Sequence, residues 1–120
     1  MSVRVLVVDD QAPFRAAMTA VVESTDGFEV VGSADDGEES LVQCARLRPD
    51  LVLMDLNLPG IDGLEATRRL RALTPRPPVV LLLSTYDVYD AYTEAGAAAF
   101  MSKSDLGPRS LAAFWSTVTR

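Results

Sequence analysis

The sequence predicts an α/β domain of the doubly wound type, in which helices cover both faces of a five-stranded parallel sheet. Short apolar, β-branched runs alternate five times with segments whose apolar residues recur at helical spacing. The runs end abruptly in polar residues, as strands buried on both faces do. With 120 residues, 48% of them hydrophobic, the chain has the size and apolar content of one domain, so we expect residues 1–120 to form a single folded unit.

The strands are predicted from runs of apolar and β-branched residues. The first run reads VRVLVV and stops at Asp9 and Asp10. The five expected strands cover residues 3–8, 28–31, 51–54, 79–83 and 98–101. Each is short enough for a buried strand and too short for a helix.

Five helices are predicted between and after these strands, because apolar residues recur there every three to four positions. The helical stripes are Phe14, Ala17, Met18 and Val21; Leu41, Cys44 and Ala45; Ala66, Leu70 and Leu73; Val88, Tyr92 and Ala95; and Leu111, Phe114, Trp115 and Val118. Gly107 and Pro108 are expected to open the last helix. We assign Cys44 and Trp115 to packing, since both lie on an apolar stripe.

Strict alternation of buried strands and helices predicts right-handed crossovers and a parallel sheet, for which we choose the flavodoxin-like order 2-1-3-4-5. In such sheets the functional site lies beyond the carboxyl ends of the strands, where the strand order reverses. Residues that directly follow the strands are therefore the candidates for function.

Composition excludes several classes of protein. Seventeen acidic against eleven basic residues leave a net charge of -6, which disfavours direct contact with nucleic acid or anionic lipid. No apolar run approaches the roughly 20 residues that span a bilayer. The single cysteine, Cys44, excludes an internal disulfide and fits a reducing cytoplasm. The chain has no histidine, so a phosphoryl donor must be another molecule.

Polar residues that suit a metal ion and a phosphoryl group follow four of the predicted strands. Asp9 and Asp10 follow the first strand and Asp55 follows the third; Ser84 and Thr85 follow the fourth, and Lys103 follows the fifth. Three carboxylates at one sheet edge repel one another, and a cation or proton uptake must relieve that repulsion. Magnesium (Mg²⁺), which prefers oxygen ligands and uses one or two carboxylates with a phosphate oxygen, fits this set.

Four motifs resemble those of bacterial two-component response-regulator receiver domains. They are VLVVDD, LVLMDLNLPGIDGLEA, LLLST and AGAAAFMSKS, in that order along nearly the whole chain. The segments DDQAPFR and FEVVGSADDGEES are most similar to the NarL/FixJ subgroup, whose members usually carry a C-terminal helix-turn-helix DNA-binding domain. The resemblance implies that Asp55 is the phosphoacceptor and that Mg²⁺ is the cofactor.

The resemblance also implies roles for the surrounding residues. Asp10 and Asp55 would bind Mg²⁺ through their side chains, Asn57 through its backbone carbonyl and Asp9 mainly through water. Lys103 would pair with one phosphoryl oxygen, and Ser84 would donate a hydrogen bond to another. Phe100 matches the aromatic position that turns inward when Ser84 moves, and Pro59, Gly60 and Gly63 match the tight turn after the phosphoacceptor.

The function that the resemblance implies is a phosphorelay receiver in the cytoplasm. A sensor histidine kinase would phosphorylate Asp55, and the switch would control an output, with transcription through a DNA-binding domain outside this chain as the expectation. Dimerisation on phosphorylation is plausible. We expect no enzymatic activity beyond Mg²⁺-dependent self-phosphorylation and slow self-dephosphorylation.

Three positions depart from the common receiver pattern. Ser104 replaces the proline that often follows the lysine, so no cis peptide bond is expected there. Phe100 lacks the hydroxyl of the frequent tyrosine and can switch only by packing. Tyr86 is placed to shield a phosphoryl group from water, although an exposed ring or a partner contact fits equally well.

Two other functions remain open. A haloacid-dehalogenase-type phosphatase also places an aspartate nucleophile after a parallel strand, but its motif needs a second aspartate where this chain has Asn57. A receiver fold used only as a binding module would not need Asp10, Asp55, Ser84 and Lys103, all of which are present.

Overall fold

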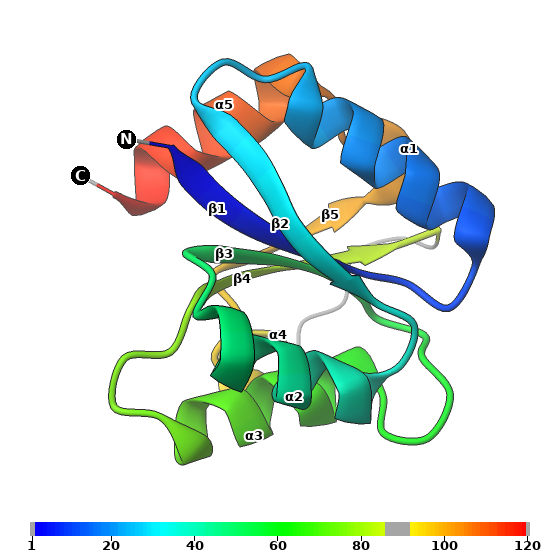
Figure 1. Ribbon diagram of the computed structural model, residues 1–120, viewed down its shortest axis with the longest axis vertical. Helices are drawn as coiled ribbons and strands as arrows, with labels where there is room; N and C mark the ends of the chain where they lie inside the picture. Colours follow the sequence, from blue (N-terminus) through cyan, green and yellow to red (C-terminus); the bar gives the residue numbers. More distant parts are fainter. Residues whose placement is uncertain (1, 86–91, 120) are drawn as a thin grey trace.

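The computed structural model describes residues 2–85 and 92–119, which form a three-layer α/β/α structure (Figure 1). Its strands are β1 (Val3–Val8), β2 (Phe28–Ala34), β3 (Leu51–Asp55), β4 (Val79–Ser84) and β5 (Ala99–Ser102). Its α-helices are α1 (Ala12–Glu23), α2 (Gly37–Leu47), α3 (Gly63–Leu73), α4 (Tyr92–Ala95) and α5 (Pro108–Val118). A short 3₁₀ helix, η1 (Lys103–Asp105), links β5 to α5.

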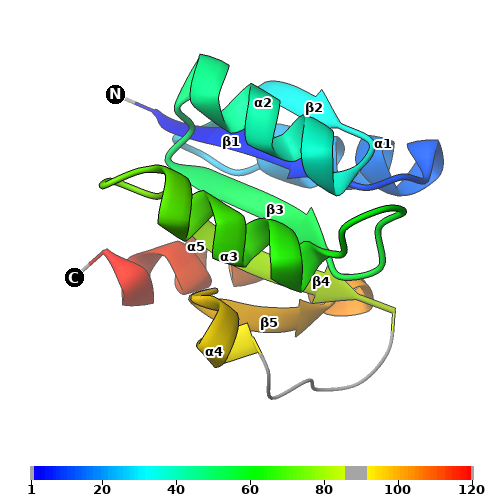
Figure 2. The same ribbon diagram turned by 90° about the horizontal axis from the view of Figure 1, so that it is seen from below.

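The sheet has the predicted topology. The strand order is β2-β1-β3-β4-β5 and all four neighbouring pairs are parallel, which confirms the doubly wound, flavodoxin-like fold with five α-helices. Helices α1 and α5 cover one face, while α2, α3 and α4 lie side by side on the other (Figure 2). All five strands point the same way, so the residues after β1, β3, β4 and β5 meet at one edge.

Alternate side chains of the central strands supply two separate cores, one on each face of the sheet. Leu6, Val52 and Leu82 belong to the core under α2, α3 and α4, whereas Val7, Leu53 and Leu81 belong to the core under α1 and α5. All six side chains are fully buried. The central strands are therefore rigid supports for the residues at their carboxyl ends.

Side-chain caps define where two of the helices begin. The Asp36 carboxylate accepts a hydrogen bond of 2.7 Å from the Glu39 N–H at the start of α2, and Asp62 does the same for Glu65 at 2.8 Å at the start of α3. Each cap satisfies one of the unpaired N–H groups of a first helical turn. Gly107 caps α5 and Pro108 is its first residue, as predicted.

Several details of the predicted stripes differ from the structure. Leu73, expected on the buried side of the third helix, is 72% exposed and is the last residue of α3. Ala17 and Ala45 are also exposed. Val88, part of the fourth predicted stripe, lies outside the described residues.

The two residues assigned to packing do pack. Cys44 is buried in the core under α2, α3 and α4, and Trp115 packs against the other core with its ring edge-on to Phe28, 6.2 Å between centroids. Of the helices in residues 2–85 and 92–119, none is both long and apolar enough to cross a membrane.

Candidate functional site

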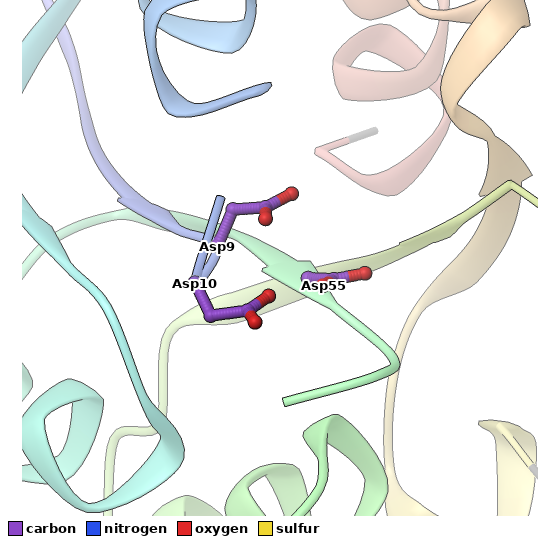
Figure 3. Close-up of side chains that lie close together, drawn as sticks. All are labelled: Asp9, Asp10 and Asp55. Atoms are coloured by element: carbon purple, nitrogen blue, oxygen red, sulfur yellow. The ribbon is translucent and has the colours of Figure 1, made fainter. Parts of the chain in front are cut away.

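Three carboxylates meet where β1 and β3 end. Asp9 and Asp10 directly follow β1, and Asp55 is the last residue of β3; their side chains point into the same space (Figure 3). One oxygen of each lies within 4.8 Å of the others. Asp9 and Asp55 are buried, whereas Asp10 is exposed at the mouth of the site. The predicted convergence of carboxylates is therefore present.

Lys103 brings a positive charge to this group. It follows β5 as the first residue of η1, and its Nζ lies 2.6 Å from Asp9 Oδ2 and 3.3 Å from Asp55 Oδ1. Only 11% of its side chain is exposed. The ammonium thus bridges two buried carboxylates that lie at the carboxyl ends of two different strands.

The pKa of Asp55 is raised in this site. Burial raises the pKa of Asp55 above its ordinary value, and the nearby negative charge of Asp9 raises it further. The Lys103 ammonium and a hydrogen bond from the Asn57 N–H act in the opposite direction but do not cancel the first two effects. Burial and the Asp9 charge thus make the ionised form of Asp55 less stable than that of an exposed aspartate, and a proton or a metal ion at this carboxylate would offset that cost.

The turn after β1 holds Asp9 in place. Asp9 Oδ1 accepts a hydrogen bond of 2.9 Å from the N–H of Gln11, and the Arg15 guanidinium donates to the Asp9 carbonyl at 2.7 Å. Because Gln11 is the residue at the N-cap position of α1, the backbone that starts the helix also orients the carboxylate. Asp9 is therefore anchored by the turn through Oδ1 and by Lys103 through Oδ2.

The loop between β3 and α3 needs small residues where it turns. A Cβ on Gly63 would lie 2.3 Å from the Asp55 carbonyl oxygen, so only glycine lets the start of α3 pass this close to β3. Gly60 has a positive φ of 74°, a conformation that glycine adopts without strain. These positions fit the tight turn expected after Asp55.

A cavity of about 360 Å³ lies over the carboxylates. Its lining consists of Asp10, Gln11, Phe14, Asp55, Asn57, Thr85 and Lys103. Ser84, the last residue of β4, is 1% exposed and lies beside Ser102 of β5, so the exposed Thr85 rather than Ser84 reaches the lining. The predicted residues Asp9, Asp10, Asp55, Asn57 and Lys103 are brought together, with Ser84 buried one residue behind.

Sequence reasoning missed two residues of this cavity, Gln11 and Phe14. Phe14 was predicted only as part of an apolar helix stripe, yet the Lys103 Nζ lies 4.0 Å from the centroid of its ring. The short spacing between Asp10 and the start of α1 could have identified both residues, since the helix begins only two residues after Asp10. A helix that starts at the carboxyl edge of the sheet has its first turn beside the site.

The remaining positions singled out from the sequence lie around the site. Phe100 of β5 is partly buried and packs against the core under α2, α3 and α4. The Lys103–Ser104 peptide bond is trans, as every peptide bond of the described residues is. Tyr86 lies outside the described residues.

Comparison with known protein families matches residues 5–113 to the response regulator receiver domain. The chain belongs to this family. Among curated proteins, the response regulator GacA of Pseudomonas viridiflava is 46% identical over 105 residues, which are 84% of this chain and 48% of that protein. A LuxR-family two-component response regulator from Aurantimonas sp. SI85-9A1 superposes with a TM-score of 0.87 at 30% identity, covering 98% of this chain and 85% of that one.

Membership identifies the chain as a receiver domain of two-component signalling, a class of domain that interacts with histidine kinases. The chain spans about half the length of the GacA relatives that it matches. The subgroup is not decided, since relatives and structural neighbours include proteins of several kinds.

The expectation that the protein has no enzymatic activity beyond self-phosphorylation and self-dephosphorylation is wrong, because the sequence of a receiver domain does not support it. A protein-glutamate methylesterase/protein-glutamine glutaminase of Idiomarina loihiensis is 38% identical over 106 residues, which are 86% of this chain but 28% of that protein. A segment of this kind therefore also occurs within proteins named as enzymes. Receiver residues carry no information about chemistry performed elsewhere in a longer chain.

Proposed function

We propose that residues 1–120 form a phosphorylation switch in which Asp55 accepts a phosphoryl group from a sensor histidine kinase in an Mg²⁺-dependent reaction. The observation that carries the proposal is the position of Lys103, whose ammonium lies 3.3 Å from Asp55 Oδ1 and 2.6 Å from Asp9 Oδ2. Asp55 supplies an oxygen nucleophile, and Lys103 supplies a cation at the point where phosphoryl charge would develop.

The donor set suits a hard divalent cation. Asp10 and Asp55 would hold Mg²⁺ through their carboxylates, Asn57 through its backbone carbonyl and Asp9 mainly through water. The clustered carboxylate oxygens support this assignment, and the raised pKa of Asp55, caused first by burial and then by the charge of Asp9, is an effect that a bound cation would offset. When bound, Mg²⁺ would neutralise charge on the transferred phosphoryl group.

The chain's own residues perform the remaining steps. A carboxylate oxygen of Asp55 forms a bond to the donor's phosphorus while the bond from phosphorus to the donor breaks, which leaves an acyl phosphate on Asp55. The Lys103 ammonium pairs with one phosphoryl oxygen, and the Ser84 hydroxyl, at the end of the neighbouring strand β4, donates to another after a local shift. The buried central strands keep these groups in register.

The readout of the switch would be the face formed by β5 and its neighbouring helices. Movement of Ser84 toward the phosphoryl group would let Phe100, which is only partly buried, turn inward by packing alone. In the full-length protein this change would control an output, transcription through a DNA-binding domain of the NarL/FixJ type, with dimerisation of the phosphorylated form. The receiver itself, with a net charge of -6, would not contact nucleic acid.

Incubation with acetyl phosphate and MgCl₂, followed by intact-mass spectrometry, tests the proposal directly. We expect one phosphoryl group per chain, lost in Asp55→Asn and absent when EDTA replaces MgCl₂. Asp26→Asn is the matched control, because Asp26 is an exposed aspartate in the turn between α1 and β2, at the opposite end of the sheet. A mass gain that survives Asp55→Asn, or no gain at all, would contradict the proposal and favour a binding module that works without phosphorylation.

A further inference from the structure

We propose that Phe14 is a positioning residue for phosphoryl transfer, and that its ring face holds the Lys103 ammonium in place. The Nζ of Lys103 lies 4.0 Å from the ring centroid, well within the roughly 6 Å over which an aromatic face attracts a cation. Phe14 also lines the cavity above Asp10 and Asp55. This inference rests on the function proposed above, since it concerns the same ammonium.

The ring is held at the site by the turn that also holds Asp9. Helix α1 starts at Ala12, only two residues after Asp10, and Pro13 fixes the backbone of its first turn. The Arg15 N–H closes that turn on the Gln11 carbonyl at 3.0 Å. Phe14 therefore cannot move far from the carboxyl edge of β1 without unwinding the start of α1.

Among the described residues, three side chains that contact the Lys103 ammonium differ in chemistry. Asp9 and Asp55 are anions, whereas the ring of Phe14 attracts a cation through its quadrupole and carries no net charge. A water molecule in place of the ring would hydrogen-bond to the ammonium and would have to leave when a phosphoryl oxygen arrives. A third carboxylate would neutralise the charge that the phosphoryl group needs. The ring removes water and leaves the positive charge available.

An apolar hollow behind the ring is consistent with this role. A cavity of about 290 Å³ lies between α1 and the β5–α5 connection, lined by side chains that include Met18, Leu106, Phe14 and Lys103. Phe14, Thr85 and Lys103 line both this cavity and the one over the carboxylates. Phe14 thus forms part of the wall between an apolar space and the charged site, and it shields one side of the ammonium.

The inference is tested by the rate at which acetyl phosphate phosphorylates Asp55 in a series of Phe14 variants. Phe14→Leu keeps an apolar side chain but has no ring face, and we expect the rate to fall about 2- to 10-fold, the range that an aromatic–cation contact supports. Phe14→Tyr keeps the ring face and should stay within about twofold of the parent. Phenylalanines with increasing fluorination at position 14, which weaken the ring quadrupole at nearly constant size, should slow the reaction progressively.

Phe28→Leu serves as the matched control. Phe28 is a partly buried phenylalanine that packs on Trp115, away from the carboxylates, so its loss should lower the melting temperature without changing the phosphorylation rate of the folded protein. Equal rates for the parent and Phe14→Leu, or a fluorinated series without a trend, would overturn the inference while the proposed function stands.

A second measurement does not depend on phosphorylation. Lys103 is the only lysine of the sequence, so protein labelled with ¹³C,¹⁵N-lysine gives the signals of this side chain alone. Its ε-methylene protons should be shifted upfield by the Phe14 ring in the parent and in Phe14→Tyr, and should return toward ordinary values in Phe14→Leu. Lys103 ε-methylene protons without an upfield shift in the parent would overturn the inference. If these protons are shifted but acetyl phosphate does not modify the protein, the contact exists but the proposed function is wrong, and Phe14 then has no role in phosphoryl transfer.

Discussion

Lys103→Met is the most informative single change in the structure. It removes an ammonium that is 11% exposed and keeps an unbranched side chain of similar length in its place. Two buried carboxylates, those of Asp9 and Asp55, lose their shared partner. We expect the metal-free protein to lose stability at neutral pH, because Asp9 and Asp55 would then face each other without a cation between them.

The size of the effect follows from the two distances. At an effective dielectric constant near 20, unit charges at 2.6 Å attract by roughly 6 kcal/mol and at 3.3 Å by roughly 5 kcal/mol. Desolvation of the ammonium offsets most of this attraction, and removal of one partner of a buried pair typically destabilises a protein by about 3–5 kcal/mol. Proton uptake by a carboxylate limits the loss, so we expect about 3 kcal/mol, or a melting temperature lower by about 10 °C.

Thermal unfolding followed by circular dichroism in EDTA measures this change. Arg109→Met is the matched control, since Arg109 is an exposed cation on α5 and its loss should change stability by less than about 0.5 kcal/mol. Addition of Asp55→Asn to Lys103→Met should recover part of the loss, because one of the two unscreened charges is then gone. The difference in melting temperature between the parent and Lys103→Met should also become smaller at low pH, where carboxylates are protonated.

Two results would refute this reasoning. If Lys103→Met melts at or above the temperature of the parent in EDTA, the ammonium does not stabilise the buried carboxylates. If the loss is the same at acidic and neutral pH, it arises from packing of the lysine stem and not from charge. Either result would remove the electrostatic basis for placing a phosphoryl group beside Lys103.

Four further outcomes can be measured. Asp55→Asn should raise the melting temperature of the metal-free protein. The gain should grow as pH rises from about 3.8 through the raised pKa of Asp55 in the folded protein, because the parent loses stability over that interval as the buried carboxyl ionises. A gain in melting temperature that does not depend on pH would contradict this. MgCl₂ at about 100 times its dissociation constant should stabilise the parent by about 2.7 kcal/mol, and Asp10→Asn should weaken that effect at the same concentration. Gly63→Ala should lower the free energy of unfolding in denaturant by about 3 kcal/mol, because its Cβ would lie 2.3 Å from the Asp55 carbonyl oxygen. Gly107→Ala is the control: a Cβ there meets no atom within 4 Å, so the loss should be less than about 1 kcal/mol. Burial raises the pKa of the Cys44 thiol to about 12, so iodoacetamide at pH 8 should alkylate the folded protein far more slowly than the protein in urea.

The fold could be predicted from sequence because the three central strands, β1, β3 and β4, are almost entirely buried. Continuous apolar runs such as VRVLVV leave little ambiguity about strands, and the helical stripes between them require parallel crossovers. Errors occurred where burial changes within one element. Leu73 has a core-type side chain, but it is the last residue of α3 and is exposed, and the point at which a helix ends is not encoded in local periodicity.

The candidate site could be predicted only in part, for a similar reason. Strand ends locate the backbone of Asp9, Asp55 and Lys103, because parallel strands bring their carboxyl ends to one edge. Which charges pair depends on side-chain reach across that edge, and the closer partner of Lys103 is Asp9 rather than Asp55, the proposed phosphoacceptor. Sequence spacing contains no information about a preference of this kind.

Phe14 shows why periodicity alone can hide a functional residue. A phenylalanine on a helical stripe matches the pattern of a core residue, and the same stripe does supply the buried Met18. However, the first turn of α1 follows the end of β1 after only a few residues, and there the Phe14 ring lies 4.0 Å from the Lys103 ammonium. Two environments, the core and the site, are therefore available to an apolar residue in the first helical turn after such a strand. The contact between Phe14 and Lys103 is the basis for our proposal that, here, the ring serves the site.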